Sequence, residues 1–86
     1  MKIKEMKQKR SQFLSKLYEM SGGDKYKWSF ISKVGEELNF DHELSENIAQ
    51  YLEGEGLIKF QTLGGGIGIT QKGIRVAEKI LSKLDI

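Results

Sequence analysis

Apolar residues recur at intervals of three and four over four stretches of the chain, and this spacing predicts four helices. The first helix spans residues 2–20, with its apolar stripe formed by Ile3, Met6, Phe13, Leu14 and Leu17. Polar residues interrupt the stripe after Met6, so residues 1–8 are expected to project from the body or to serve as a dimerisation arm. Ser21 and the two following glycines are expected to end this helix.

The second predicted helix is short and carries Ile31, Val34 and Leu38 on one face. Ser29 is expected to cap its N-terminus, because a serine hydroxyl can accept a hydrogen bond from a free backbone N–H of the first turn. Asn39 is expected to end it in the left-handed conformation.

A third helix over residues 42–53 follows after about three residues, a spacing that forces a tight helix–turn–helix. Asp41 is its expected N-cap. Its apolar face contains Leu44, Ile48, Tyr51 and Leu52, and its polar face contains His42, Glu43, Glu46, Asn47, Gln50 and Glu53.

Alternating residues predict the strands. The segment Tyr26–Trp28 could be a very short strand or an extended entry segment to the second helix. Residues 57–62 are predicted to form a strand, with Ile58 and Phe60 on one side, and residues 67–69 begin the return strand of a hairpin. Thr70 is expected to cap a final helix with an apolar face of Ile74, Ala77, Ile80 or Leu81, and Leu84.

With 86 residues, of which 38% are hydrophobic and 30% charged, the chain is predicted to form one folded domain over residues 1–86. It has no cysteine, so disulfides, thiolate nucleophiles and cysteine-ligated zinc are excluded. It lacks an apolar run of the roughly 18 residues that a membrane span needs. The basic start MKIKEMKQKR precedes no apolar stretch and is not a secretory signal. We therefore expect a cytoplasmic protein.

The order helix, short strand, helix, tight turn, helix, hairpin, helix resembles the winged helix-turn-helix superfamily over roughly residues 10–84. The likeness is carried by ISKVGEELNFDHELSENIAQYLEGEGLIKF and by the hairpin exit GGGIGITQKG. The fold class expected from this resemblance is mainly α with a small antiparallel β-hairpin, in the order α-(short β)-α-α-β-β-α. The resemblance also implies that the third helix is a recognition helix in the major groove. The wing, formed by Leu63, Gly64, Gly65 and Gly66, would lie near the backbone or minor groove.

Charge is divided unevenly along the chain. Residues 1–33 hold nine Lys/Arg and three acids, residues 34–56 hold seven acids and no Lys/Arg, and residues 57–86 hold five Lys/Arg and two acids. The expected recognition helix therefore carries no lysine or arginine, although most affinity for duplex DNA comes from neutralising phosphates.

Two functions fit this pattern. The first is a DNA-binding domain of the transcriptional-regulator type. Its base-facing candidates are His42, Asn47 and Gln50, because Asn and Gln amides pair with adenine edges. Its phosphate-facing candidates are Lys7, Lys9, Arg10, Lys25, Lys27, Lys33, Lys59 and Lys72. Those from residues 7–33 could line one side, or the charges of the first helix could form an ordinary solvated helix face.

The second function is a protein-interaction module without DNA binding. An acidic face formed by Glu43, Glu46 and Glu53 would dock a basic protein surface or the basic N-terminal region of another copy. The apolar stripes of the first and last helices could also pair two copies into a homodimer, as the winged-helix resemblance implies.

No residue set predicts catalysis, a cofactor or a metal site. The stretch Gly64–Gly68 lacks the Gly-Lys-Ser/Thr ending of a phosphate loop and is expected to be a hairpin turn. His42 is the only histidine, and the acids around it are expected to be a solvated face. Tyr26, Trp28 and Phe30 could form a stacking platform for single-stranded nucleic acid. Trp28 is nevertheless expected to pack in the core, where the second helix meets the hairpin.

Overall fold

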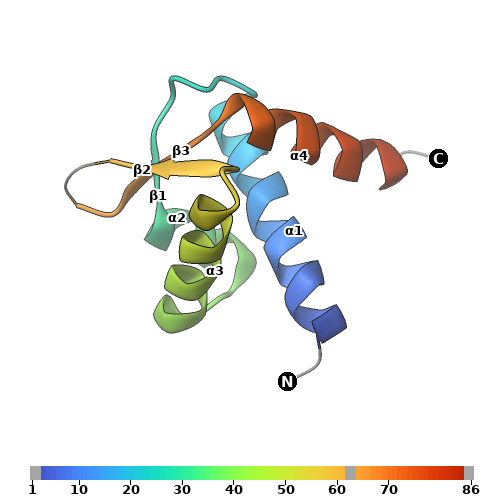
Figure 1. The fold of residues 1–86 in the computed structure, drawn as a ribbon. Coiled ribbons are helices and arrows are strands. Elements are labelled where there is room, and N and C mark those ends of the chain that lie inside the picture. Colours follow the sequence, from blue (N-terminus) through green and yellow to red (C-terminus); the bar gives the residue numbers. More distant parts are fainter. Residues whose placement is uncertain (1–2, 62–63, 85–86) are drawn as a thin grey trace.

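Four helices pack on one face of a small antiparallel sheet in the computed structural model, which describes residues 3–61 and 64–84 (Figure 1). In chain order the elements are α1 (Ile3–Ser21), β1 (Ser29–Phe30), α2 (Ile31–Leu38), α3 (His42–Gly54), β2 (Ile58–Phe60), β3 (Gly66–Ile69) and α4 (Gln71–Leu84). The prediction of a mainly helical fold with a small antiparallel hairpin is confirmed, and so is the order of its elements.

The three strands form one sheet in the order β1-β3-β2, so β3 lies in the middle. Its antiparallel register pairs Phe30 with Gly66 on one side, and Lys59 with Gly68 on the other. Since side chains alternate between the two faces of a strand, Ile67 and Ile69 point to the face opposite that of the glycines. These isoleucines and Ile58 are buried, so this inner face of the sheet belongs to the core.

The core joins every helix to the inner face of the sheet. α1 lies at its centre, with Phe13, Leu14 and Leu17 almost fully buried. The other buried apolar residues are Ile31, Val34, Ile48, Ala49, Leu52, Ile58, Ile67, Ile69, Ile74 and Ala77. The N-terminal turns of α1 extend past this core, and Ile3 is 76% exposed. Figure 1 shows the N-terminal end of α1 and the C-terminal end of α4 diverging from each other.

Three predicted helix ends are confirmed. Asn39 ends α2 in the left-handed conformation, at φ 59° and ψ 35°. Asp41 caps α3, where its Oδ1 accepts a hydrogen bond of 2.8 Å from the Leu44 N–H. The Thr70 hydroxyl accepts a 3.0 Å bond from the Gly73 N–H at the start of α4.

At the start of α2 the N-cap prediction is wrong, and so is the strand reading of Tyr26–Trp28. Ser29 and Phe30 pair with β3, so the short strand is Ser29–Phe30 and residues 26–28 precede it. Ser29 is therefore a strand residue, and Phe30 occupies the N-cap position without a side-chain hydrogen bond. The free Ile31 N–H of the first turn instead donates to the Gly65 carbonyl, at 3.1 Å.

The buried side of α3 also differs from the prediction. Tyr51 is 43% exposed, whereas Ser45 and Ala49 are buried. The Ser45 hydroxyl donates to the Asp41 carbonyl at 2.8 Å, and this bond satisfies it inside the core. Among the other predicted positions, Leu63 and the side chain of Leu84 lie outside the described residues.

Candidate nucleic-acid interface

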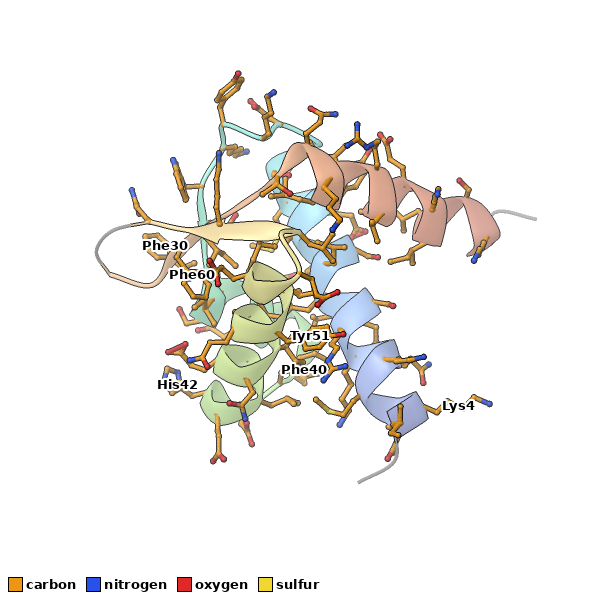
Figure 2. All side chains as sticks on the ribbon, in the orientation of Figure 1. Lys4, Phe30, Phe40, His42, Tyr51 and Phe60 are labelled. Carbon is orange, nitrogen blue, oxygen red and sulfur yellow. The ribbon has the colours of Figure 1, made fainter. Side chains whose placement is uncertain are left out.

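α3 presents one face to the core and the other to solvent. Its N-terminus is fixed by the Asp41 cap, and Ile48 and Leu52 bury its inner side. The three predicted base-facing residues, His42, Asn47 and Gln50, are all exposed. Figure 2 shows His42 at the N-terminal end of α3, away from α1. The structure therefore brings these three residues onto a single outward-facing helix.

The same face of α3 is acidic. Glu43 and Glu53 are exposed and Glu46 is partly exposed. The Glu46 Oε1 lies 3.7 Å from the His42 Nε2, a contact that is an ion pair only when the histidine is protonated. Within residues 3–61 and 64–84, no lysine or arginine forms a salt bridge with any of these glutamates. Their charge would repel phosphates placed beside them.

The predicted phosphate-facing cations occupy three places rather than one line. The first group lies on the N-terminal half of α1 and contains Lys7, Lys9 and Arg10. The Arg10 guanidinium lies 3.5 Å from the centre of the Tyr51 ring, a cation–π contact between α1 and α3 that no sequence pattern predicted. The second place is α4, where Lys72 donates a 3.0 Å hydrogen bond to the Glu55 carbonyl.

The third group of cations comes from three segments, and two of its lysines lie over exposed aromatic rings. Lys25 and Lys27 lie in the loop after α1, Lys33 lies on α2, and Lys59 lies on β2. The Lys59 Nζ lies 5.5 Å from the centre of the Trp28 ring. The Lys25 Nζ similarly lies 5.4 Å from the Tyr26 ring.

Trp28 contacts the solvent-facing side of the sheet, where β3 has no side chains. Phe30, Lys59, Gly66 and Gly68 share this face, as their cross-strand pairing requires. A Cβ added to Gly68 would lie 3.3 Å from Trp28 Cε3 and 3.3 Å from Lys59 Cε, so both side chains cover the glycine. We call the surface formed by Trp28, Phe30, Lys59, Gly66 and Gly68 the outer face of the sheet.

The prediction that Trp28 packs in the core is wrong. Its side chain is 42% exposed, and Phe30 is 51% exposed. The inner face of the sheet is filled by isoleucines, which leaves the tryptophan on the other side. Phe60 is also 42% exposed, but it pairs with Ile67 and therefore lies on the inner side, at the open end of β2. In Figure 2, Phe30 and Phe60 both lie toward the β2–β3 turn.

The predicted wing is a glycine turn between β2 and β3. Gly64 and Gly65 have φ angles of 80° and 74°, values that residues other than glycine rarely adopt. Gly66 belongs to β3, and Leu63 lies outside the described residues. The described part of this turn carries no charged side chain.

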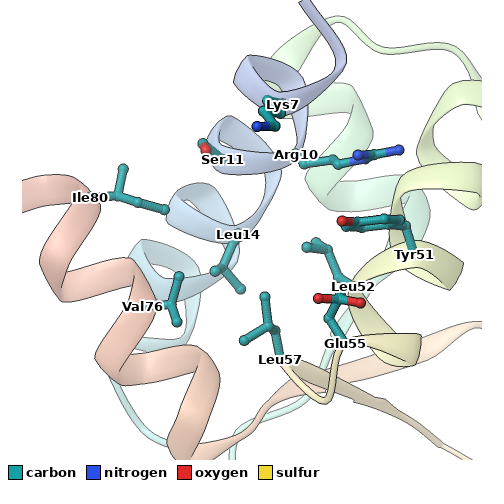
Figure 3. Close-up of a pocket in the computed structure, with 10 residues that line it drawn as sticks. All are labelled: Lys7, Arg10, Ser11, Leu14, Tyr51, Leu52, Glu55, Leu57, Val76 and Ile80. Carbon is teal, nitrogen blue, oxygen red and sulfur yellow. The ribbon is translucent and has the colours of Figure 1, made fainter. Parts of the chain in front are cut away.

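A cavity of about 240 Å³ opens between α1, α3 and α4 (Figure 3). Its apolar floor includes Leu14 and Val76, and Lys7, Arg10 and Glu55 stand at its polar side. Small-molecule sites usually measure about 300 Å³ or more, so this cavity is small for such a ligand. No group of three potential metal ligands is found in the described residues.

A hydrogen bond between α1 and α4 raises the pKa of one tyrosine, Tyr18. The Tyr18 hydroxyl donates to the Glu78 Oε2 at 2.9 Å. This bond to a carboxylate, helped by partial desolvation and by the negative charge, raises the pKa of Tyr18 above its usual value of 10.0. The contact joins α1 to α4 and takes no part in the candidate interface.

Comparisons with protein-family models, curated proteins and solved structures found no match for this chain. Among the described residues, no helix is both long enough and apolar enough to cross a membrane.

Proposed function

We propose that this chain is a non-catalytic DNA-binding module of the winged helix-turn-helix type, as found in transcriptional regulators. The observation that supports it is the outward placement of α3, with His42, Asn47 and Gln50 exposed. Asparagine and glutamine amides can pair with adenine edges in the major groove. In this arrangement α3 enters the groove and the β2–β3 turn lies beside the DNA backbone.

The phosphate contacts have to come from elements next to α3, because α3 itself carries no lysine or arginine. Lys33 on α2 and Lys59 on β2 can serve on one side, and Lys7 on α1 on the other. Arg10 contributes its charge from a fixed position, since its guanidinium stacks on Tyr51.

Fluorescence anisotropy with a labelled duplex of random sequence, across a salt series, tests this proposal. Affinity should fall steeply with salt, and each lost phosphate contact should reduce the log–log slope by about 0.9. Lys33→Gln and Lys59→Gln should each show that change, whereas Lys83→Gln, near the far end of α4, should match the wild type. Absence of duplex binding at low salt and micromolar protein would contradict the proposal.

A second candidate function is a protein-interaction module that binds a basic surface through α3. The observation that favours it is the absence, in the described residues, of any lysine or arginine paired with Glu43, Glu46 or Glu53. The double variant Glu43→Lys/Glu46→Lys separates the two functions. It should abolish binding to a polylysine probe if α3 docks a basic partner, and it should strengthen duplex binding if α3 faces phosphates.

Pairing of two copies through α1 and α4 would give the twofold symmetry with which many duplex readers bind. A second cavity, of about 340 Å³, lies between these helices and is lined in part by Ile80 and Leu81. Sedimentation of the wild type should then show a dimer that Leu81→Glu dissociates. A wild-type monomer at high concentration would exclude this arrangement.

A further inference from the structure

Of the outer face of the sheet, the proposed duplex interface uses only Lys59, and this face also carries the exposed rings of Trp28 and Phe30. We infer that it is a second binding surface, for single-stranded DNA, on which unpaired bases stack against Trp28 and Phe30. Nucleic-acid bases stack on exposed aromatic side chains with little sequence preference, because every base has a π face. Bases inside a duplex cannot reach such rings.

The middle strand has no side chain of its own on this face. Gly66 pairs with Phe30 and is covered by the Gln61 side chain, and Gly68 lies beneath Trp28 and Lys59. A side chain at Gly68 would press on the tryptophan ring. Trp28 is therefore held at the surface and is 42% exposed, whereas the buried side chains on the inner face of the sheet are isoleucines.

The charge of the chain segments that hold the rings fits a phosphate backbone. Residues 24–33 and 57–61 contain four lysines and a single acid, Asp24. The Asp24 Oδ1 already accepts a 2.8 Å hydrogen bond from the Tyr26 N–H and so helps to shape the loop. The Lys59 Nζ lies over the Trp28 ring, 5.5 Å from its centre, and its flexible side chain can reach a phosphate next to a base stacked there.

Other ligands would match either the lysines or the aromatic rings of this surface, but not both. An acidic protein segment would match the lysines but has no need of exposed rings. The same face of a second copy would match the rings but would place lysines against lysines. A single strand of nucleic acid supplies both flat bases and negative charge. The choice of DNA rests on the proposed function of α3.

The test uses the fluorescence of Trp28, which is the only tryptophan in the chain and therefore reports on this face alone. The probe is an oligothymidylate of about 12 nucleotides, within the site sizes usual for such surfaces. We expect saturable quenching of Trp28, with an affinity that falls as salt rises. The slope of that salt dependence should decrease by about 0.7 in Lys59→Gln.

Anisotropy of the labelled oligothymidylate follows the variants. Phe30→Leu and Trp28→Leu should each weaken binding about 5-fold or more, since one base–aromatic stack contributes at least about that factor. The matched control is Tyr51→Leu, which removes an aromatic ring of nearly equal exposure, 43%, from α3. It should bind the single strand as the wild type does. Circular dichroism establishes that each variant is folded.

The two functions fail separately in this design. Asn47→Ala/Gln50→Ala should weaken duplex binding and leave Trp28 quenching by oligothymidylate unchanged, and loss of quenching in that variant would overturn the inference. Quenching without any duplex binding would remove the proposed function of α3 but retain the second surface.

Three results would overturn the inference directly. The first is oligothymidylate binding that neither quenches Trp28 nor responds to Phe30→Leu. The second is displacement of the strand by polyglutamate as effective as by unlabelled oligothymidylate, because it would show a surface that reads charge alone. The third is self-association that Phe30→Leu abolishes, because a second copy would then cover the face. Tighter quenching by oligouridylate than by oligothymidylate would overturn the assignment to DNA.

Discussion

Gly73 packs directly against the main-chain carbonyl of Leu57, which occupies the position that a Cβ at Gly73 would need. The same carbonyl accepts a 3.1 Å hydrogen bond from the Thr70 N–H. The first turn of α4 is therefore seated on the chain just before β2, and the sequence Ile-Thr-Gln-Lys-Gly at residues 69–73 provides both the cap and the close approach.

We expect Gly73→Ala to lower the free energy of unfolding by about 2–3 kcal/mol, because backbone cannot move aside as a flexible side chain can. Urea denaturation measures the change. Gly54→Ala is the matched control. Gly54 is the last residue of α3, and no heavy atom lies within 4 Å of the position that a Cβ would take there. Its stability should stay equal or rise by up to about 1 kcal/mol. Equal losses in the two variants would contradict the packing argument.

Removal of the α3 cap should destabilise the domain without touching the exposed face of the helix. Asp41→Ala deletes the acceptor for the Leu44 N–H and is expected to cost about 1 kcal/mol. Asp41→Asn keeps an acceptor at the same place and should lose much less. Thermal and urea unfolding of the two variants give the comparison, and an unchanged Asp41→Ala protein would show that the cap contributes nothing.

The hydrogen bond between Tyr18 and Glu78 makes stability depend on alkaline pH. Because the pKa of Tyr18 is higher in the folded chain than its usual 10.0, the contribution is fully present below pH 10.0. It is lost as pH rises through the raised pKa, where the phenol ionises beside the carboxylate. Tyr18→Phe should thus be less stable than the wild type at neutral pH, and the difference should shrink above pH 10.0.

Urea unfolding at a series of pH values measures this difference, and absorbance of the tyrosinate in Glu78→Gln supplies the control. Removal of the charge at residue 78 should return the pKa of Tyr18 toward its usual value. A stability difference between wild type and Tyr18→Phe that is constant with pH would show that the bond to Glu78 is not its source.

The stack of Arg10 on Tyr51 should appear as a coupling energy between α1 and α3. A double-mutant cycle with Arg10→Met and Tyr51→Leu is expected to give about 0.5–1 kcal/mol, as for other partly exposed cation–π pairs. Tyr51→Phe retains the ring and should preserve most of it. If the losses in free energy of unfolding of the two single variants simply add in the double variant, the two residues are adjacent without a stabilising interaction.

Features set by local hydrogen bonds were predictable from the sequence. Asn39, Asp41 and Thr70 end or begin helices through contacts within four residues, so their residue types were sufficient evidence. The outward face of α3 followed in the same way from its helical period.

Features set by distant partners were not predictable. The strand at Ser29–Phe30 exists because Ile67 and Gly66 pair with it, and the N–H of Ile31 is satisfied by Gly65. Tyr51 was predicted to face the core because its position follows the apolar period of α3. The arginine that covers its ring instead comes from α1, and no pattern within α3 indicates that contact. The alternation of Gly66 and Gly68 in a strand was the available hint that large side chains lie across it.

The position of β3 in the middle of the sheet has a consequence for biosynthesis. β1 and β2 do not pair with each other, and each finds its partner only in residues 66–69. A nascent chain that has emerged as far as residue 61 holds both outer strands without hydrogen-bond partners, and the inner face lacks Ile67 and Ile69. Completion of the sheet therefore waits until residues 66–69 have left the ribosome.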